Sequence, residues 1–410
     1  MPKKSAFLKE KNHFLLVVLD GVGDRPVKAL GSRTPLEAAR TPNLDWLMKK
    51  GRGGLIEPVF EGPFPTSKDA HLSLFGYSLP KWDMGRGVFE AAGLGMKLKK
   101  NDIAFRGNWA TVDEGLKILD RRAGRIKETK VLVRALKKIR SVSGARFIIK
   151  PGIEHRFVLV MRGKNLSDQI TANDQHQVGV KVPLVASLDG RPESQRTAAI
   201  LNHFLEEAHR LLKNHPFNEA RKKKNLWPAN YLLLRGVGRL KEIPSFQEKW
   251  DLSACFITGG GLYRGIAKIL GMKEIEVLGA TGTAATNLEG KFQTAAKMME
   301  KAPFLFLHIK GTDTYSHDGD CQGKKAFIEK IDQALKPLLD LSGTTIAVTA
   351  DHCTPCERKE HSTDLIPALI WSKKIREDAL EHFGEKECLQ GSLGLIKQNQ
   401  FLAAVLENWL

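Results

Sequence analysis

The sequence predicts an α/β fold with a mainly parallel sheet flanked by helices. Short apolar runs bounded by Gly, Asp or polar loops recur along the chain, at 14–21, 156–163, 230–238, 304–313, 344–352 and 365–372. These runs are too short and too continuous for surface helices, so we interpret them as buried strands. Helical patterns lie between them, for example at 197–213, 261–270 and 325–341. Strands that alternate with helices are typical of a parallel sheet covered by helices.

The length of the chain predicts two domains. Its 410 residues exceed what one hydrophobic core normally organises. The segment 112–226 is rich in Arg and His and has few carboxylates at strand ends. We therefore predict a discontinuous core of residues 1–111 and 227–410 that is interrupted by an inserted domain of residues 112–226.

The charge balance favours acidic partners without identifying a nucleic-acid site. The chain has 64 Lys+Arg against 46 Asp+Glu, a formal net charge of +18. The basic residues are dispersed, and the densest cluster, at 221–224, lies beside no zinc-finger, RRM or KH signature. Solvated surface is thus favoured over specific nucleic-acid binding, and the positive potential would steer a small phosphorylated acid toward the protein.

The N-terminus and the cysteines point to the cytoplasm. We expect the first residues to be a flexible basic leader, because the apolar run 14–19 is too short for a signal peptide. No run approaches the roughly 20 apolar residues that cross a bilayer. Five cysteines, an odd number, fit a reducing compartment. Cys353 and Cys356 have the spacing of a zinc or redox motif, but there is no second pair, so two reduced thiols in a loop are favoured.

Possible metal ligands follow the apolar runs in three clusters. Each has an ordinary alternative: an Asp-Gly turn, a chance pair of residues four apart, or a polar loop. Taken together they favour a metal centre, because ligands gather beyond the carboxyl ends of strands in such sheets. Carboxylate and imidazole donors suit Zn²⁺ or Mn²⁺, and paired sites suit phosphoryl transfer. The clusters are Asp20; Asp313 with His317; and Asp351, His352 and His361.

A candidate nucleophile lies in the loop before an apolar helix-like segment. Thr66 and Ser67 stand at this position. A hydroxyl residue at a helix start is most often only an N-cap. The functional interpretation is a hydroxyl that attacks phosphorus, and the two roles are compatible because a helix N-terminus also suits a phosphate.

Several motifs together resemble the archaeal-type branch of cofactor-independent phosphoglycerate mutase. They are LDG at 19–21, S-x-x-x-H-L-S-L-x-G-Y at 67–77, GRGVFEAAG at 85–93, FRGNWATVD at 105–113, DRRAGRI at 120–126, EHRFVLVMRG at 154–163, D-x-x-x-HDGD at 313–320 and ADHCTPC with a later His at 350–361. The resemblance implies an alkaline phosphatase-like core with a smaller inserted α+β substrate domain. It also implies interconversion of 3-phosphoglycerate and 2-phosphoglycerate through a phosphoserine, without 2,3-bisphosphoglycerate. Two divalent metals would take part, manganese first, with zinc, cobalt or magnesium as alternatives.

The resemblance also implies roles for single residues. One metal would be held by Asp313, His317 and His361, and the other by Asp20, Asp351, His352 and the hydroxyl of Ser67, the nucleophile. Arg121 and Arg125 resemble the pair that grips the carboxylate and phosphate, which suits the planar fork of arginine. Arg264 stands where the family usually has a lysine at the phosphate. His155 is either part of the substrate site or structural.

The chain departs from the family pattern around the nucleophile. The loop reads T-S-K-D-A-H where G-S-D-V-A-H is usual, so Thr66 is an alternative nucleophile and Lys68 replaces an acidic residue. Gly311, Thr312 and Cys353 are also unusual at their positions. Related activities stay open: a metal-dependent phosphatase, a phosphodiesterase or another phosphomutase. The oligomeric state is not predicted.

Overall fold

The computed structural model describes residues 13–407, which form two compact units. The first unit contains the described residues up to Asp83 and those from Ile243 on, and the second is Met84–Glu242. The basic residues predicted as a flexible leader lie outside the described part. No helix between residues 13 and 407 is long and apolar enough to cross a membrane.

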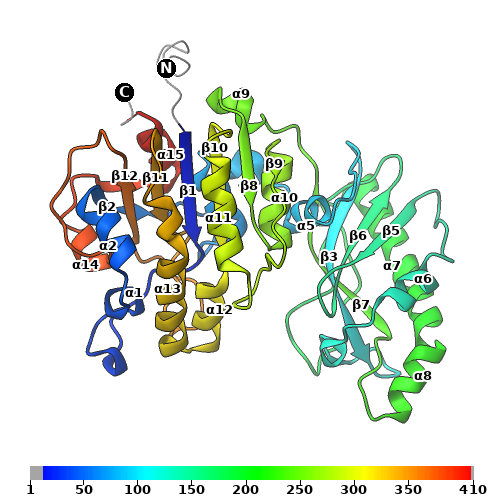
Figure 1. Cartoon of the computed structure of the whole chain (residues 1–410). Helices are drawn as coiled ribbons and strands as arrows, with labels where there is room; N and C mark the ends of the chain where they lie inside the picture. Colours follow the sequence, from blue (N-terminus) through cyan, green and yellow to red (C-terminus); the bar gives the residue numbers. More distant parts are fainter. Residues whose placement is uncertain (1–12, 408–410) are drawn as a thin grey trace. The chain divides into compact units, whose positions relative to one another are not determined.

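The first unit is built on an eight-stranded sheet with the strand order β13-β2-β12-β11-β1-β10-β8-β9 (Figure 1). The strands β11, β1, β10, β8 and β9 run parallel, whereas β12 is antiparallel to both of its neighbours. The predicted mainly parallel sheet is confirmed. The strands are β1 (His13–Leu19), β2 (Arg52–Glu57), β8 (Ala254–Ile257), β9 (Lys273–Glu274), β10 (Phe304–Ile309), β11 (Thr344–Thr349), β12 (Ile366–Trp371) and β13 (Gly394–Lys397).

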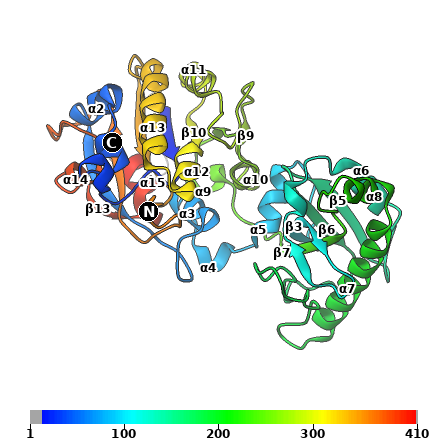
Figure 2. The ribbon, with the colours of Figure 1, turned by 90° about the horizontal axis from the view of Figure 1, so that it is seen from below.

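Helices cover both faces of this sheet. α11 (Leu288–Met298) and α13 (Cys321–Leu335) pack together on one face, and α3 (Ser67–Leu74) and α15 (Gln398–Glu407) pack together on the other (Figure 2). The remaining helices of the unit are η1 (Lys28–Leu30), α1 (Pro35–Ala38), α2 (Pro42–Lys49), α4 (Leu79–Trp82), α9 (Phe246–Trp250), α10 (Gly261–Ile269), α12 (Gly311–Asp318), η3 (Lys336–Leu338) and α14 (Glu385–Cys388).

The central strands are sheltered on both faces, as their continuous apolar sequences predict. Every residue of β10, β11 and β12 is buried. All six apolar runs form strands, and the helical patterns at 197–213, 261–270 and 325–341 fall in α7, α10 and α13 with its continuation η3. The run 304–313 is a strand only to Ile309, because α12 begins at Gly311.

The second unit is a smaller antiparallel α+β domain. Its sheet has the order β4-β3-β6-β5, and β7 also pairs with β3. α6 and α7 pack against each other, α6 against β5 and α7 against β7, and together they enclose an apolar core. The elements are α5 (Arg86–Gly93), β3 (Ile103–Val112), β4 (Ile118–Asp120), η2 (Ala123–Arg125), α6 (Lys130–Leu136), β5 (Arg146–Pro151), β6 (Arg156–Arg162), α7 (Pro192–Lys213), α8 (Pro216–Lys223) and β7 (Tyr231–Arg239).

This unit is wider than the inserted domain that the sequence predicts. The prediction placed β3 and β7 in the core, at the ends of the segments 1–111 and 227–410. Instead the two strands pair with each other along their length, from Ile103 beside Arg239 to Ala110 beside Tyr231. Because this pairing joins both strands to β6, they belong to the second sheet, and α5 belongs to the same compact unit.

Candidate metal and phosphoryl-transfer centre

The predicted ligands meet at one edge of the first sheet. Asp20 follows β1, and Asp313 lies in the first turn of α12, just after β10. Asp351 and His352 follow β11, and His361 precedes β12, which runs antiparallel to β11 and so starts at the same edge. Two groups of possible ligand atoms result, and within each group all the atoms lie within 4.8 Å of one another. The groups are Asp20, Asp351 and His352; and Asp313, His352 and His361.

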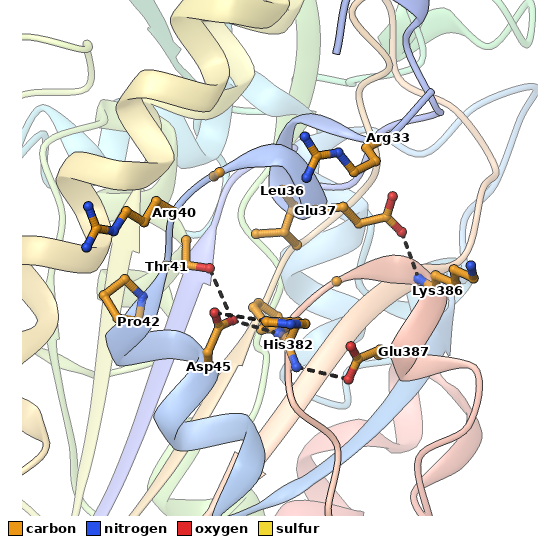
Figure 3. A pocket seen from close by; sticks show the side chains of 13 residues that line it. Arg33, Leu36, Glu37, Arg40, Thr41, Pro42, Asp45, His382, Lys386 and Glu387 are labelled. Carbon is orange, nitrogen blue, oxygen red and sulfur yellow. Dashed lines mark hydrogen bonds and ion pairs between the residues drawn. The ribbon is translucent and has the colours of Figure 1, made fainter. Parts of the chain in front are cut away.

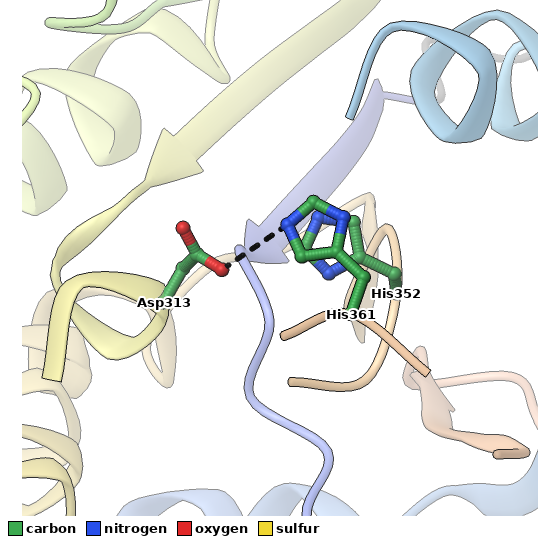
Figure 4. Close-up of side chains that lie close together, drawn as sticks. All are labelled: Asp313, His352 and His361. Atoms are coloured by element: carbon green, nitrogen blue, oxygen red, sulfur yellow. Dashed lines mark ion pairs between the residues drawn. The ribbon is translucent and has the colours of Figure 1, made fainter. Parts of the chain in front are cut away.

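The histidines present their Nε2 atoms to the carboxylates. His317 Nε2 and His361 Nε2 lie 3.3 and 3.7 Å from the same oxygen, Asp313 Oδ1. Their Nδ1 atoms are bonded outward, to the carbonyl oxygens of Lys359 and Pro65. An Nδ1–H donated to a carbonyl leaves the lone pair on Nε2, the arrangement common to histidines that bind metals. Figure 4 shows the His361 ring directed at the Asp313 carboxylate.

His352 connects the two groups. Its ring stacks on that of His361 with the centroids 3.6 Å apart (Figure 4). Its Nε2 lies 3.7 Å from Asp20 Oδ1 and 3.2 Å from Asp351 Oδ2. Burial, followed by the nearby His361, lowers the pKa of His352 to about 3, so the ring is neutral at physiological pH. A neutral imidazole is the form that a metal ion needs.

The carboxylates are buried and incompletely bonded. Among the described residues, Asp20 Oδ1 and Asp351 Oδ2 are buried oxygens without a hydrogen-bond donor. Burial raises the pKa of Asp351, and the neighbouring Asp20 adds to the effect. Unpaired oxygens of this kind are costly unless a cation compensates them. The donor set therefore fits divalent metal ions.

Ser67, and not Thr66, faces the ligand groups. Ser67 is the first residue of α3, and its Oγ lies 3.3 Å from His352 Nε2. The Thr66 hydroxyl caps the same helix, accepting from the backbone N–H of Asp69 and donating to its carboxylate. His71 Nδ1–H donates to the Ser67 carbonyl oxygen at 2.7 Å, which fixes the first turn. The geometry favours Ser67 as the reactive hydroxyl.

Lys310 and His308 are among the side chains of the centre that escaped the sequence prediction. Lys310 Nζ lies 3.1 Å from Asp20 Oδ2 and 2.6 Å from Asp313 Oδ2. His308 Nε2 lies 3.0 Å from Asp20 Oδ2. Burial works against ionisation of Asp20, yet Lys310 and then His308 hold its pKa well below the usual range. Both residues lie at the end of β10, the position from which the sequence predicted the other residues of the centre, so they could have been predicted in the same way.

Two other cations near these elements are paired elsewhere. Lys68 forms ion pairs with Asp69 and Asp83 at 3.0 and 2.6 Å, so two carboxylates compensate its charge beside Ser67. Arg264 Nε lies 2.6 Å from Glu274, an ion pair that occupies the side chain proposed for the phosphate.

In the second unit, three predicted residues meet in a cavity of about 180 Å³. Arg121, Arg125 and His155 line it. The sequence missed its other lining residues, although Arg235 interrupts an apolar strand run, which was a signal. These are Asn108, Arg122, Glu154, Arg156 and Arg235. With five arginines against one glutamate in its wall, the cavity suits a small anion.

The groups in this cavity are not equally free. Arg121 makes a bidentate pair with the buried Asp174, at 2.8–3.0 Å. His155 Nδ1 and Arg235 Nε are buried without a hydrogen-bond partner among the described residues. Burial, followed by Arg156 and Arg122, lowers the pKa of His155 to about 4. Two nitrogen atoms in this basic cavity are thus left without a hydrogen-bond acceptor among the described residues.

Other features of the first unit do not form a metal group. All five cysteines are free, and Cys353 and Cys356 are buried. A cavity of about 490 Å³ is lined by α1, α2 and the segment 382–387. Its carboxylates, Glu37, Asp45 and Glu387, accept backbone N–H groups of Lys386, Phe383 and His382 (Figure 3). These carboxylates connect segments of the chain, and among residues 13–407 they belong to no group of possible metal ligands.

Comparison with known proteins identifies the family. A family model described as 2,3-bisphosphoglycerate-independent phosphoglycerate mutase matches residues 49–218. A protein of Methanococcus aeolicus with the same description is 44% identical over 396 residues, covering 96% of this chain and 97% of that protein. The chain belongs to the 2,3-bisphosphoglycerate-independent phosphoglycerate mutase family. The resemblance found in the motifs is thereby confirmed.

Solved structures agree with this membership. A Pyrococcus horikoshii protein superposes with a TM-score of 0.83 and 34% identity, covering 97% of each chain. The cofactor-independent phosphoglycerate mutase of Thermoplasma acidophilum gives a TM-score of 0.73 and 34% identity, covering 97% of this chain and 99% of that one. Both units of the present fold therefore belong to the mutase family architecture.

Proposed function

We propose that this protein is an isomerase that interconverts 3-phosphoglycerate and 2-phosphoglycerate without 2,3-bisphosphoglycerate, in glycolysis and gluconeogenesis. Its relatives carry this activity in their names. The observation that carries the proposal is that Ser67 Oγ lies 3.3 Å from His352 Nε2. His352 belongs to both groups of possible metal ligands. A reactive hydroxyl beside such a group is what a phosphoenzyme requires.

Ser67 acts as the nucleophile in this proposal. Its Oγ loses its proton and forms a bond to phosphorus, the bond from phosphorus to the substrate oxygen breaks, and the released oxygen takes up a proton to give glycerate. The other hydroxyl of the bound glycerate then loses its proton and attacks phosphorus of the phosphoserine. The Oγ–P bond breaks, and Ser67 Oγ takes up a proton, which restores its hydroxyl. The position of Ser67 at the first residue of α3 supports this role, because the N–H groups of that turn favour a phosphoryl group.

Two divalent metal ions, manganese first, would bind the ligand groups. Asp20, Asp351, His352 and Ser67 would hold one ion, and Asp313, His317 and His361 the other. The inward Nε2 atoms and the unpaired oxygens support this assignment. Such ions lower the pKa of a bound hydroxyl and stabilise phosphoryl oxygens.

The cavity of the second unit supplies the substrate-binding residues. Arg125 and Arg156 offer guanidinium groups that pair with carboxylate or phosphate, and His155 offers a ring nitrogen without a hydrogen bond. Arg235 adds a third guanidinium group, which also lies 3.7 Å from Asp174. The Arg121 guanidinium group is already bonded to Asp174, so it is less free than the others to pair with the substrate. We propose that these groups retain glycerate while it reorients, which favours transfer to its second hydroxyl over hydrolysis. The free cysteines favour a reducing compartment, in line with a cytoplasmic enzyme.

Trapping the phosphoenzyme tests the proposal. The protein is mixed with 3-phosphoglycerate and Mn²⁺, quenched and digested, and the phosphopeptide is mapped by mass spectrometry. Phosphate on Ser67 is expected. Phosphate on Thr66 would move the nucleophile by one residue, and an absence of phosphopeptide under turnover conditions would refute the phosphoserine.

A further inference from the structure

Lys310 is the one cationic side chain among the described residues that contacts carboxylates of both ligand groups. It lies between the end of β10 and the start of α12. Its Nζ lies 3.1 Å from Asp20 of one group and 2.6 Å from Asp313 of the other. Its ammonium also lies 5.4 Å from the centre of the Tyr263 ring, so an aromatic face supports the charge.

The two oxygens of each carboxylate contact different partners. Lys310 contacts Oδ2 of Asp20 and Oδ2 of Asp313. The opposite oxygens, both Oδ1, face the imidazoles: Asp20 Oδ1 toward His352, and Asp313 Oδ1 toward His317 and His361. The lysine therefore occupies the side of each carboxylate that is turned away from the histidine ligands.

From this division of oxygens we propose that Lys310 is a positioning residue, which holds Asp20 and Asp313 so that their Oδ1 atoms point into the metal centre. By contacting both carboxylates it fixes one ligand group relative to the other. The inference rests on the proposed metal centre and adds a residue to it. Hydrogen-bonding partners behind ligating carboxylates typically contribute 10- to 100-fold to metal affinity.

The opposite role would be competition, in which the lysine occupies the place of a metal ion. A competitor would contact the oxygens that face the histidines. Lys310 contacts the other two, while Asp20 Oδ1 has no donor among residues 13–407. The metal-facing oxygen thus stays available while the lysine remains bound.

Calorimetric titration of MnCl₂ into the full-length protein, freed of metal with EDTA, tests the role of Lys310. We expect Lys310→Gln to bind Mn²⁺ roughly 10- to 100-fold more weakly than the unmodified protein. Lys310→Arg, which keeps the charge and can donate to both carboxylates, should recover part of the affinity and serves if the Gln variant does not fold. Lys325→Met is the matched control, because Lys325 is similarly exposed, at 28% against 24%, and pairs at the same 2.6 Å with Glu329, away from the ligands.

The outcomes separate this inference from the proposed function. Unchanged Mn²⁺ affinity in Lys310→Gln would overturn the positioning role, and tighter binding would identify Lys310 as a competitor. Saturating Mn²⁺ should restore most of the kcat of Lys310→Gln, and a persistent loss would contradict a role limited to positioning. If the unmodified protein binds no Mn²⁺, the metal centre of the proposed function fails instead.

Discussion

Ser67 and His352 lie in contact across the first unit, with Oγ 3.3 Å from Nε2, although 285 positions separate them in the sequence. α3 supplies the serine at its N-terminus, and the loop after β11 supplies the histidine. The hydroxyl of Thr66, the residue before Ser67, is instead hydrogen-bonded to Asp69. This contact distinguishes two neighbouring hydroxyls that the sequence alone left as alternatives.

Replacing each hydroxyl residue should separate catalysis from stability. Ser67→Ala should abolish turnover and leave the unfolding temperature nearly unchanged, because the carboxylates and imidazoles remain. Thr66→Ala should keep most activity but cost about 1 kcal/mol of stability, since it removes an N-cap. Thermal unfolding and steady-state kinetics of both variants give the comparison. An active Ser67→Ala enzyme would contradict the assignment.

Arg125 should act on substrate binding. Arg125→Ala should raise KM more than it lowers kcat, by an amount equivalent to roughly 2–5 kcal/mol if the pair with the substrate is desolvated. Arg125→Lys should recover only part, because the planar fork is lost. Arg134→Ala, an exposed arginine on α6 outside the cavity, is the control. A normal KM in Arg125→Ala would remove this residue from the substrate site.

Arg121 should act first on stability. When the arginine is removed, the buried carboxylate of Asp174 loses its bidentate partner and keeps only Arg235, whose Nε lies 3.7 Å away. Arg121→Ala should therefore destabilise the protein by roughly 3–5 kcal/mol. The double variant Arg121→Ala/Asp174→Asn should recover much of this loss, because the buried carboxylate is removed together with its bidentate partner. Urea unfolding of the three proteins measures the effect, and a fully stable single variant would show that the pair contributes nothing.

His155 predicts a pH dependence of stability. Its pKa in the folded protein is lowered to about 4, by burial and then by Arg156, from the usual 6.5. Between pH 6.5 and 4 the unfolded chain binds more protons at this site, so the histidine makes the folded protein less stable as the pH falls. His155→Gln should lose less stability than the unmodified protein over this range. Equal slopes of unfolding free energy against pH would contradict the lowered pKa.

Three predicted ligand residues lie at one edge of the sheet for a physical reason that the sequence reveals. Asp20, Asp313 and Asp351 follow apolar runs, and the carboxyl ends of neighbouring parallel strands meet at one edge. Lys310 was missed because a lysine after a strand resembles ordinary surface charge, and only its three-dimensional contacts with Asp20 and Asp313 distinguish it.

The domain boundary failed for a related reason. β3 and β7 have the apolar composition of core strands, and composition does not reveal which strands pair. Their mutual pairing, with Asn108 beside Leu233, places them in the second sheet. The same pairing carries Arg235 into the anion cavity, so the missed boundary and the missed arginine have one cause.

The central claim is mutase chemistry at a metal-dependent serine. It is tested most directly by a coupled assay that follows 3-phosphoglycerate to 2-phosphoglycerate without 2,3-bisphosphoglycerate, before and after EDTA treatment. We expect turnover in the untreated enzyme, its loss after chelation and its return with Mn²⁺. Full activity in the metal-free protein, a strict need for bisphosphate, or release of inorganic phosphate in place of 2-phosphoglycerate would contradict the account.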